Sequence, residues 1–271
     1  MSANLVKAGF EVRGYDISTK PRAALKRAGG KPVTSIARLE APILITSLPT
    51  AAALHSVSET LSGKNRIVVE TSTLPIEDKE RARDALKRKG ITLLDCPLSG
   101  TGAQAKVRDL VVFASGDRSG FETAKTIFPG FSRSHYYVGA FGNGSRMKFV
   151  ANLLVAIHNV AAAEAFVLGR KSGLPAQMIF DVIANSAGTS RMFQVRGPQM
   201  VRRRYHGPGI ALELFQKDMK IIGEFAARIG APTSLFNASA AIYNAAMAQG
   251  HAKDDTAAVC AVLESMAGIR R

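Results

Sequence analysis

Two sequence patterns meet at the stretch Gly139-Ala-Phe-Gly-Asn-Gly-Ser-Arg-Met-Lys148. Its glycines predict a turn, and the apolar, alanine-rich residues after them predict one long helix that ends near Lys171. Before the stretch, short apolar runs alternate with helical patterns, and after it the strand signals end. The stretch therefore joins an α/β region to an all-helical region.

Short apolar runs mark the strands of the first region. Because a helical pattern follows most of them, they predict a parallel sheet whose strands are joined by helices. The expected strands are Glu11–Tyr15, Pro32–Val33, Pro42–Thr46, Arg66–Glu70, Ile91–Asp95, Val111–Ser115 and His135–Val138. The expected helices are Lys20–Ala28, Ile36–Leu39, Ala51–Leu61, Ile76–Lys89 and Phe121–Ile127. Residues 1–141 are thus expected to form a Rossmann-like α/β domain of the nucleotide-binding type.

Helices follow one another through the second region. Leu174-Pro175 and Arg196-Gly-Pro198 are expected to separate them, because proline cannot continue the hydrogen-bonding pattern of a helix. The helices expected after the long one are Gln177–Asn185, Leu212–Ile229, Ser234–Ala248 and Asp254–Ala267. Residues 142–271 are therefore expected to form an all-helical domain, and a chain of 271 residues is long enough for two cores.

The composition is that of an ordinary globular protein with a basic bias. Thirty-six Lys and Arg against 21 Asp and Glu give a net charge of +15. This excess is dispersed along the chain, and the short cluster Arg202–Arg204 is not part of a basic strip with interleaved aromatic residues. A basic surface that attracts small anions is favoured over nucleic-acid binding, so no nucleic-acid partner is expected.

The longest apolar stretch, Phe149 to Gly169, has the length of a membrane span. It contains Asn152, His158, Asn159 and Glu164, which are costly to place in lipid, and many alanines that suit close helix packing. A soluble helix buried on several sides is therefore expected, with no membrane association. The first ten residues also lack the basic and apolar regions of a signal peptide.

Cysteine and histidine usage points to a cytoplasmic protein without a metal site. Cys96 and Cys260 are far apart in apolar surroundings, which is typical of reduced thiols. The five histidines share no metal-ligand spacing, and no cysteine joins them. No metal is expected.

Asp16 follows the first expected strand, in the sequence Gly14-Tyr15-Asp16. In a Rossmann unit a carboxylate here binds the ribose hydroxyls of NAD and repels the 2′-phosphate of NADP. Lys20 and Arg22 could instead accept a phosphate, so NADP stays open, and an acidic residue here is also a common turn or cap residue. The sequence contains no G-x-G-x-x-G before Asp16, and Met1–Lys7 is expected to be the later part of the helix that normally follows that turn.

Three further motifs have specific spacings. Asp95-Cys-Pro-Leu-Ser-Gly-Thr-Gly102 is similar to D-A-P-V-S-G-G, Gly142-Asn-Gly-Ser-Arg-Met-Lys-Phe-Val-Ala-Asn152 to G-x-G-x-x-x-K-x-x-x-N, and Leu214-Phe-Gln-Lys-Asp-Met219 to L-x-x-K-D-L. With Asp16 and the segment Asn4–Val12, they resemble the β-hydroxyacid dehydrogenase family from Ser2 to about Gly268. That family includes 3-hydroxyisobutyrate dehydrogenase, tartronate semialdehyde reductase and L-threonate dehydrogenase and, more distantly, 6-phosphogluconate dehydrogenase.

Lys148 and Asn152 are the catalytic candidates. They stand four residues apart on the long helix, so both side chains can address one substrate oxygen. A partly desolvated lysine near a helix N-terminus has its ammonium form destabilised, which suits a general base. On spacing alone a solvated lysine on an amphipathic helix is the more common case, and it is the resemblance that assigns Lys148 the proton and Asn152 the alignment of the reacting groups.

The resemblance also implies which residues bind substrate and cofactor. The Ser99 hydroxyl and the amides of Gly100 and Thr101 would accept a substrate carboxylate, although an S-G-T-G turn alone is usually plain surface. Thr101 replaces a family glycine. The residues implied to contact the cofactor are Asp16, Leu48 and Pro49 in one loop, Thr73 in the next, and Lys217 with Asp218.

The resemblance implies an oxidoreductase that moves a hydride between NAD, or NADP, and the hydroxyl carbon of a small 3-hydroxy acid. Because the glycine-rich turn is missing from the sequence, the alternative is a truncated, cofactor-binding-defective remnant or a mis-started reading frame of such an enzyme. Imine reductases share the architecture but usually carry another residue at the lysine position. A homodimer or homotetramer, paired through the helical domain, is expected.

Overall fold

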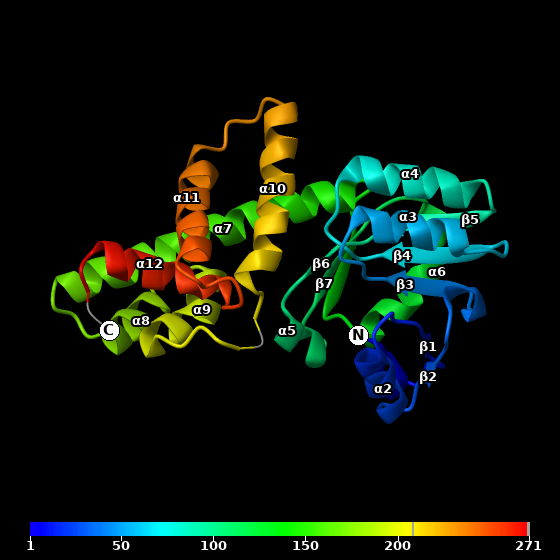
Figure 1. Cartoon of the computed structure of the whole chain (residues 1–271), viewed down its shortest axis with the longest axis horizontal. Helices are drawn as coiled ribbons and strands as arrows, with labels where there is room; N and C mark the ends of the chain where they lie inside the picture. The colour runs from blue at the N-terminus through cyan, green and yellow to red at the C-terminus, as the bar shows by residue number, and fades with distance from the viewer. Residues whose placement is uncertain (208, 270–271) are drawn as a thin grey trace. The chain divides into compact units, whose positions relative to one another are not determined.

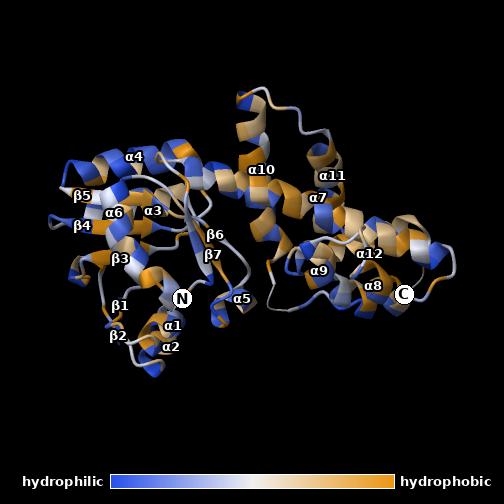
Figure 2. Cartoon of the chain, turned by 180° about the vertical axis from the view of Figure 1, so that it is seen from behind, coloured by the Kyte–Doolittle hydropathy of each residue, from blue (hydrophilic) through white to orange (hydrophobic). Residues whose placement is uncertain are grey.

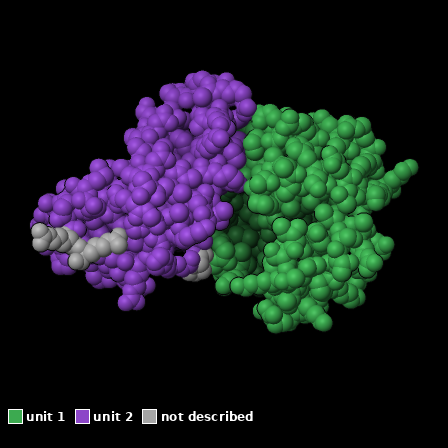
Figure 3. Space-filling model, viewed as in Figure 1, with its two compact units in different colours: residues 1–148 green, residues 149–271 purple. Residues whose placement is uncertain are grey.

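The chain folds into two compact units, Met1–Lys148 and Phe149–Arg271, which Figure 3 shows in separate colours. The structure is a computed structural model and describes residues 1–207 and 209–269. The first unit combines parallel strands with helices, and the regular elements of the second, in its described residues, are helices (Figure 1). This arrangement confirms the predicted fold class.

The first unit follows the alternation read from the sequence. Its strands are β1 (Arg13–Gly14), β2 (Lys31–Pro32), β3 (Ile43–Thr46), β4 (Arg66–Glu70), β5 (Ile91–Asp95), β6 (Leu98–Ser99), β7 (Val111–Ala114) and β8 (Ser134–Tyr137). Its helices are α1 (Ser2–Lys7), α2 (Thr19–Arg27), α3 (Ala51–Thr60), α4 (Ile76–Lys87), α5 (Gly102–Lys106) and α6 (Arg118–Ala124), with 3-10 turns η1 (Ile36–Arg38) and η2 (Lys125–Gly130). The short β6 and α5 are additions to the predicted elements.

Three small sheets organise these strands. β3, β4 and β5 are parallel neighbours, β1 pairs with β2 in parallel, and β7 pairs with β6 antiparallel and with β8 in parallel. An isolated bridge between Asp95 and Ser115 links the end of β5 to the residue after β7. The carboxyl end of β5 is therefore fixed from two sides, by β4 and by this bridge.

Side chains of the central sheet alternate between two hydrophobic clusters. Val68 and Leu93 belong to one cluster, with helices α3 and α4, while the next residues, Val69 and Leu94, belong to the other, with α6 and η2. Successive side chains of a strand point to opposite faces, so β4 and β5 are covered by apolar residues on both faces. This explains why both read in the sequence as nearly unbroken apolar runs.

A groove of about 600 Å³ lies between β1 and β3. Arg13 and Gly14 line it from β1, and Ile43 and Ile45 line it from β3. In the described residues β1 is hydrogen-bonded to β2 and β3 to β4, each on one side. The expected five-residue strand Glu11–Tyr15 is shorter in the structure because only a two-residue ladder with β2 supports it.

The second unit is made of helices. They are α7 (Asn143–Lys171, which begins in the first unit), α8 (Ala176–Ile183), α9 (Arg191–Arg202), α10 (Leu212–Arg228), α11 (Ser234–Ala248), η3 (Thr256–Ala258) and α12 (Val259–Met266). The predicted break at Arg196–Pro198 is wrong, since α9 runs through it. A Cβ on Gly197 would lie 2.6 Å from the Phe180 ring, so this glycine lets α8 and α9 pack closely and the packing offsets the helix-breaking tendency of Pro198.

Helix α7 is long and apolar enough to cross a membrane by length and composition, and in Figure 2 it is visibly more hydrophobic than α4. Its polar residues are nevertheless used within its own unit. Asn159 is fully buried and donates to Tyr243 Oη and to Thr256 Oγ1, both at 3.1 Å. A helix whose polar face is bonded to neighbouring helices behaves as the centre of a helical domain.

Replacing Gly144 tests how closely the start of α7 packs against β5 and β7. A Cβ here would lie 2.4 Å from Phe113 O and 2.6 Å from Asp95 O, so Gly144→Ala is expected to lower the free energy of unfolding by about 1–3 kcal/mol, as overpacking does. Urea unfolding measures the change. The matched control is Gly223→Ala inside α10, where the nearest atom is 4.0 Å away and alanine favours the helix. Equal destabilisation by both substitutions would contradict the close seating of α7.

Candidate active site

The first turn of α7 is held by side chains from outside the helix. Ser115 Oγ accepts a hydrogen bond from Gly144 N (2.9 Å), and Asp95 Oδ2 accepts one from Ser145 N (2.7 Å). Asp95 Oδ1 also accepts from Ser145 Oγ at 2.8 Å. Amides of a first helical turn have no partner within the helix, so Asp95 and Ser115 cap α7 from the ends of β5 and β7.

Lys148 and Asn152 lie on α7 one turn apart. Their residues are 7% and 5% exposed, which is unusual for a lysine and an asparagine on a helix surface. The common outcome for a lysine on an amphipathic helix, a solvated ammonium group, is therefore not what the structure has. Lys148 ends the first unit, directly after the turn that Asp95 caps.

In the second unit Asn152 is joined to Asp218. Asn152 Nδ2 donates to Asp218 Oδ2 at 2.9 Å, and Lys217 Nζ lies 3.1 Å from Asp218 Oδ1. Because an ionised carboxylate only accepts hydrogen bonds, Asp218 fixes which end of the Asn152 carboxamide is the nitrogen. The carbonyl end of Asn152 is thereby directed away from Asp218. The structure thus brings together three of the residues singled out from the sequence.

The predicted substrate residues form the link between β6 and α5. Ser99 ends β6, Gly100 follows, and Thr101 is the N-cap of α5. Thr101 Oγ1 accepts from Gln104 N at 3.3 Å, and Gln104 Oε1 accepts from Thr101 N at 2.9 Å. In this capping box the Thr101 amide is bonded to Gln104, so an anion bound here competes with that carboxamide.

The two predicted loops beside the central sheet touch each other. Leu48 N donates to Ser72 Oγ at 2.7 Å, which joins the loop after β3 to the loop after β4. Leu48 and Thr73 are half-buried, and Pro49 is exposed. Both loops follow the carboxyl ends of parallel strands, where ligands of α/β sheets bind.

Asp16 lies in the groove between β1 and β3, which Ser47 also lines. Its side chain is half-buried, and Asp16 Oδ1 accepts from Ser18 N at 2.8 Å. The Asp16 carboxylate therefore stabilises the turn that follows β1, and it also lines the groove. Ser47, the residue before Leu48, is the point at which the loop after β3 reaches this groove.

The structure contains a buried group of charged side chains that was not predicted from the sequence. Lys79 Nζ lies 2.6 Å from Glu70 Oε2 and 2.8 Å from Asp95 Oδ1, and all three side chains are fully buried. Lys79 Nζ also donates to Ser72 O at 2.6 Å. Glu70 and Asp95 stand opposite each other at the ends of β4 and β5. We call Glu70, Lys79 and Asp95 the buried charged cluster.

Two signals in the sequence could have revealed the buried charged cluster. Glu70 and Asp95 each close an apolar strand, and Lys79 occupies the apolar face of α4 with Ile76, Ala82 and Leu86. Burial alone would lower the pKa of Lys79, but attraction to Asp95 and Glu70 raises it above the ordinary lysine value. Lys79 is therefore a permanent cation that balances two carboxylates.

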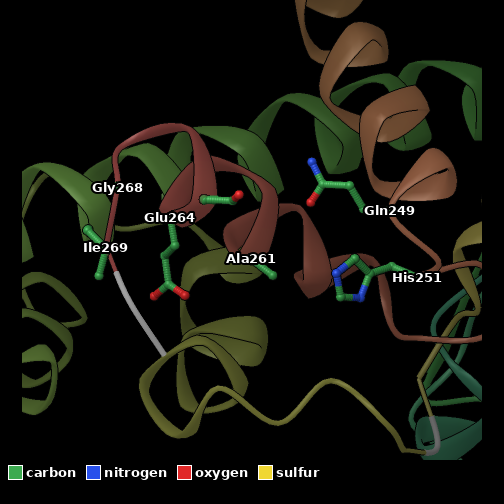
Figure 4. Close-up of a pocket in the computed structure, with 7 residues that line it drawn as sticks. Gln249, His251, Ala261, Glu264, Gly268 and Ile269 are labelled. Atoms are coloured by element: carbon green, nitrogen blue, oxygen red, sulfur yellow. The ribbon is translucent and has the colours of Figure 1, made fainter.

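Other features of the molecule lie away from these residues. A pocket of about 610 Å³ in the second unit is lined by Gln249, His251, Glu264 and their neighbours (Figure 4), and it contains none of the predicted site residues. Cys96 and Cys260 are buried and form no disulfide, and burial raises the pKa of the Cys260 thiol to about 12. Among residues 1–207 and 209–269, no group of three His, Cys, Asp or Glu is placed to hold a metal ion.

Two protein-family models match the chain. The model described as the NAD binding domain of 6-phosphogluconate dehydrogenase matches residues 1–139. The model described as the NAD-binding of NADP-dependent 3-hydroxyisobutyrate dehydrogenase matches residues 142–263. The two matches cover most of both units.

Individual proteins agree with these models. The chain is 31% identical over 278 residues to a probable 3-hydroxyisobutyrate dehydrogenase of Mycobacterium tuberculosis, covering 98% of this chain and 94% of that protein. It is 29% identical over 268 residues to the L-threonate dehydrogenase of Cupriavidus necator, covering 96% of this chain and 90% of that protein.

Among solved structures, 3-hydroxyisobutyrate dehydrogenase from Salmonella typhimurium has a TM-score of 0.87 to this chain at 26% identity, covering 96% of this chain and 94% of that one. Matches of this extent over both units do not favour the alternative of a cofactor-binding-defective remnant. The resemblance read from Asp16, Lys148 and their motifs is confirmed, and the chain belongs to the β-hydroxyacid dehydrogenase family of NAD(P)-dependent oxidoreductases.

Proposed function

We propose that this chain is an NAD(P)-dependent dehydrogenase that acts on the hydroxyl carbon of a small 3-hydroxy acid, with Lys148 as general acid and base. The single observation that carries the proposal is the burial of Lys148 and Asn152 one turn apart on α7, just after a firmly capped turn. Burying a lysine is costly, and a buried lysine beside residues of a proposed substrate site is a candidate for a functional amine.

The first unit has features that fit the adenosine end of the cofactor. Asp16 places a carboxylate at the end of β1 in an open groove whose walls include Leu25 and Leu39. A carboxylate there would bind ribose hydroxyls, and the apolar walls would contact the base. Leu48, Pro49 and Thr73 would meet the nicotinamide end, and NAD(P) when bound supplies the hydride or accepts it.

The substrate would be held by its carboxylate. Ser99 offers a hydroxyl, and the neighbouring amides of Gly100 and Thr101 offer N–H donors once Gln104 gives way. The names of the relatives support a hydroxy acid, since they are L-threonate and 3-hydroxyisobutyrate dehydrogenases. A related dehydrogenase structure from Mycobacterium tuberculosis contains L-serine, which is itself a 3-hydroxy acid.

Lys148 would move the proton of the reacting hydroxyl. During oxidation its amine takes the hydroxyl proton, and during reduction its ammonium returns that proton to the carbonyl oxygen. Asn152, oriented by Asp218, would hold the hydroxyl or the amine in line through its carbonyl end. Lys217, paired with Asp218, would contribute positive charge for the cofactor or substrate anion.

Assays with a panel of 3-hydroxy acids, each with NAD⁺ and with NADP⁺, test this function. The expected result is reduction of one cofactor with at least one acid. Titration of NADH by fluorescence shows independently whether the chain holds a dinucleotide. A chain that neither binds NADH nor oxidises any acid of the panel would instead support the remnant.

The same proposal assigns roles to the two domains and an oligomeric state to the protein. Residues 1–141 would bind the cofactor and residues 142–271 would provide the helical substrate and pairing domain. The protein would be cytoplasmic. A homodimer or homotetramer is supported by exposed apolar residues on α7, among them Val150 and Leu154. Light scattering after size-exclusion chromatography measures the oligomer, and a monomer would contradict the pairing.

Asp16 sets the expected cofactor preference. Asp16→Ser removes the carboxylate that binds ribose hydroxyls and repels a 2′-phosphate, so the ratio of kcat/KM for NADP⁺ to that for NAD⁺ is expected to rise by about 10-fold or more, the size of a hydrogen bond to a charged group. Steady-state kinetics with both cofactors measure the ratio. The control is Glu59→Ser, an exposed carboxylate that does not line the groove. A similar rise in both variants would mean that overall charge, not Asp16, sets the preference.

A further inference from the structure

The turn of α7 that precedes Lys148 is fixed by one side chain in particular. Asp95 is fully buried, and both of its carboxylate oxygens bond to Ser145, one to the amide and one to the hydroxyl. Ser145 stands three residues before Lys148, about one helical turn away. Any shift of Ser145 relative to β5 therefore moves Lys148 with it.

Asp95 is itself held in one place. Its main-chain N–H and C=O bond to Ser115 O and Ser115 N at 3.0 and 2.8 Å, and Lys79 Nζ approaches Asp95 Oδ1 at 2.8 Å. Glu70 holds Lys79 from the other side. Ser115 Oγ also donates to Asp95 Oδ2 at 3.3 Å, so both carboxylate oxygens are held by buried neighbours in addition to Ser145.

Asp95 also begins the segment that carries the proposed substrate residues. Ser99 follows it by four positions, after Cys96 and Pro97, and Gly144 packs against the Asp95 carbonyl so closely that a Cβ would lie 2.6 Å from it. Asp95, which caps the helix that carries Lys148, is therefore also the residue at which the segment with the proposed substrate residues begins. Asp95 therefore connects the two parts of the proposed site within the first unit, α7 through its carboxylate and the substrate loop through the main chain.

We propose that Asp95 is a positioning residue for the reaction, which acts through Ser145 to place the Lys148 amine and which the Glu70–Lys79 pair holds in register. The inference rests on the proposed role of Lys148. Misplacing a catalytic group by about 1 Å can cost about 100-fold in rate, so the contribution of Asp95 is expected mainly in kcat.

Two substitutions test the two bonds separately. Ser145→Ala removes the hydroxyl bond and keeps the amide bond, and it is expected to lower kcat by about 10-fold or more with little change in KM. Asp95→Asn keeps the shape, but its NH₂ group must face either the Ser145 amide or Lys79, and two donors cannot bond to each other. A larger fall in kcat and a displaced pH profile of kcat are expected, because Lys148 then sits in a different environment.

Controls separate positioning from loss of stability. Ser132→Ala removes another buried serine hydroxyl of the first unit, which bonds to Phe128 O at 2.8 Å, and it should leave kcat and its pH profile unchanged. Ser145→Thr restores the hydroxyl and should recover kcat. Hydrogen exchange gives a readout without turnover: the amides of residues 143–148 should exchange at least about tenfold faster in Ser145→Ala and Asp95→Asn and not in Ser132→Ala.

The outcomes are distinguishable from failure of the proposed function. If Lys148→Ala abolishes turnover while Ser145→Ala keeps the wild-type kcat, pH profile and exchange rates, Asp95 is not a positioning residue and the function stands. If Lys148→Ala has no effect on turnover, the role of Lys148 fails and the positioning role fails with it. Should Asp95→Asn not fold, Ser145→Ala and Ser145→Thr decide the question alone.

Discussion

Replacing Lys148 with alanine is expected to lower kcat by about 10²–10⁴-fold, the usual contribution of a general acid and base, while the affinity for NADH stays nearly unchanged. The reason is the position of the side chain. Lys148 is buried at the start of α7 with Asn152 one turn further, and the residues proposed to hold the adenosine end of the cofactor lie on other elements. Steady-state assays measure kcat, and fluorescence titration measures the affinity for NADH.

Two further variants make this result specific. Lys148→Arg keeps a positive charge but cannot release its proton at neutral pH, so it should be nearly as inactive as alanine. Lys171→Ala removes an exposed lysine from the last turn of the same helix and should keep full activity. Activity in Lys148→Arg close to that of the wild type would mean that the charge of Lys148 matters and its proton does not.

Replacing Lys79 with methionine is expected to lower the free energy of unfolding by about 3–5 kcal/mol, the cost of breaking a buried ion pair on one side. The methionine fits the space, but Glu70 and Asp95 are then left as two carboxylates 0% exposed to water without their cation. Denaturant unfolding measures the loss. Lys87→Met, at an exposed position of the same helix, should change stability by only about 0.5 kcal/mol.

The pH dependence of this loss has a defined sign. The folded state raises the pKa of Lys79 above the ordinary value of about 10.4, so it binds this proton more tightly than the unfolded chain does. The stability that Lys79 contributes is therefore present below about pH 10.4 and is lost as the pH rises above that value. The difference between wild type and Lys79→Met should be constant from neutral pH to about 10 and shrink above it, whereas a difference that falls already near pH 8 would contradict the ion-pair explanation.

The sequence predicted the strands and helices that have a clear pattern of apolar residues. Arg66–Glu70 and Ile91–Asp95 were located to the residue, because both are apolar runs buried on two faces. The break expected at Pro198 failed, since local propensity cannot register that Phe180 packs against Gly197. The α5 helix was missed because its start depends on a four-residue capping box at Thr101 rather than on apolar periodicity.

The site was predictable as a set of residues but not as a set of contacts. Lys148 and Asn152 share a helix, so their spacing was readable, whereas Asn152 and Asp218 are 66 positions apart and meet only in the folded second unit. The buried charged cluster combines the ends of two strands with one position of α4. In the sequence each of these three charged residues resembles a surface residue. The register of β4 with β5 places Glu70 beside Asp95, and the position of α4 places Lys79 between them.

The groove between β1 and β3 has a consequence for how the protein behaves in concentrated solution. Consecutive peptide groups of a strand point to opposite edges, so β1 and β3, each hydrogen-bonded to one neighbour in the described residues, turn their second edges toward the same space. An unpaired strand edge can form backbone hydrogen bonds with an extended segment of another chain. Two such edges that face one groove can pair with the same segment on both of its sides. Arg13 and Glu11 line this groove with exposed charged side chains, and natural sheets use such charges to discourage pairing between molecules.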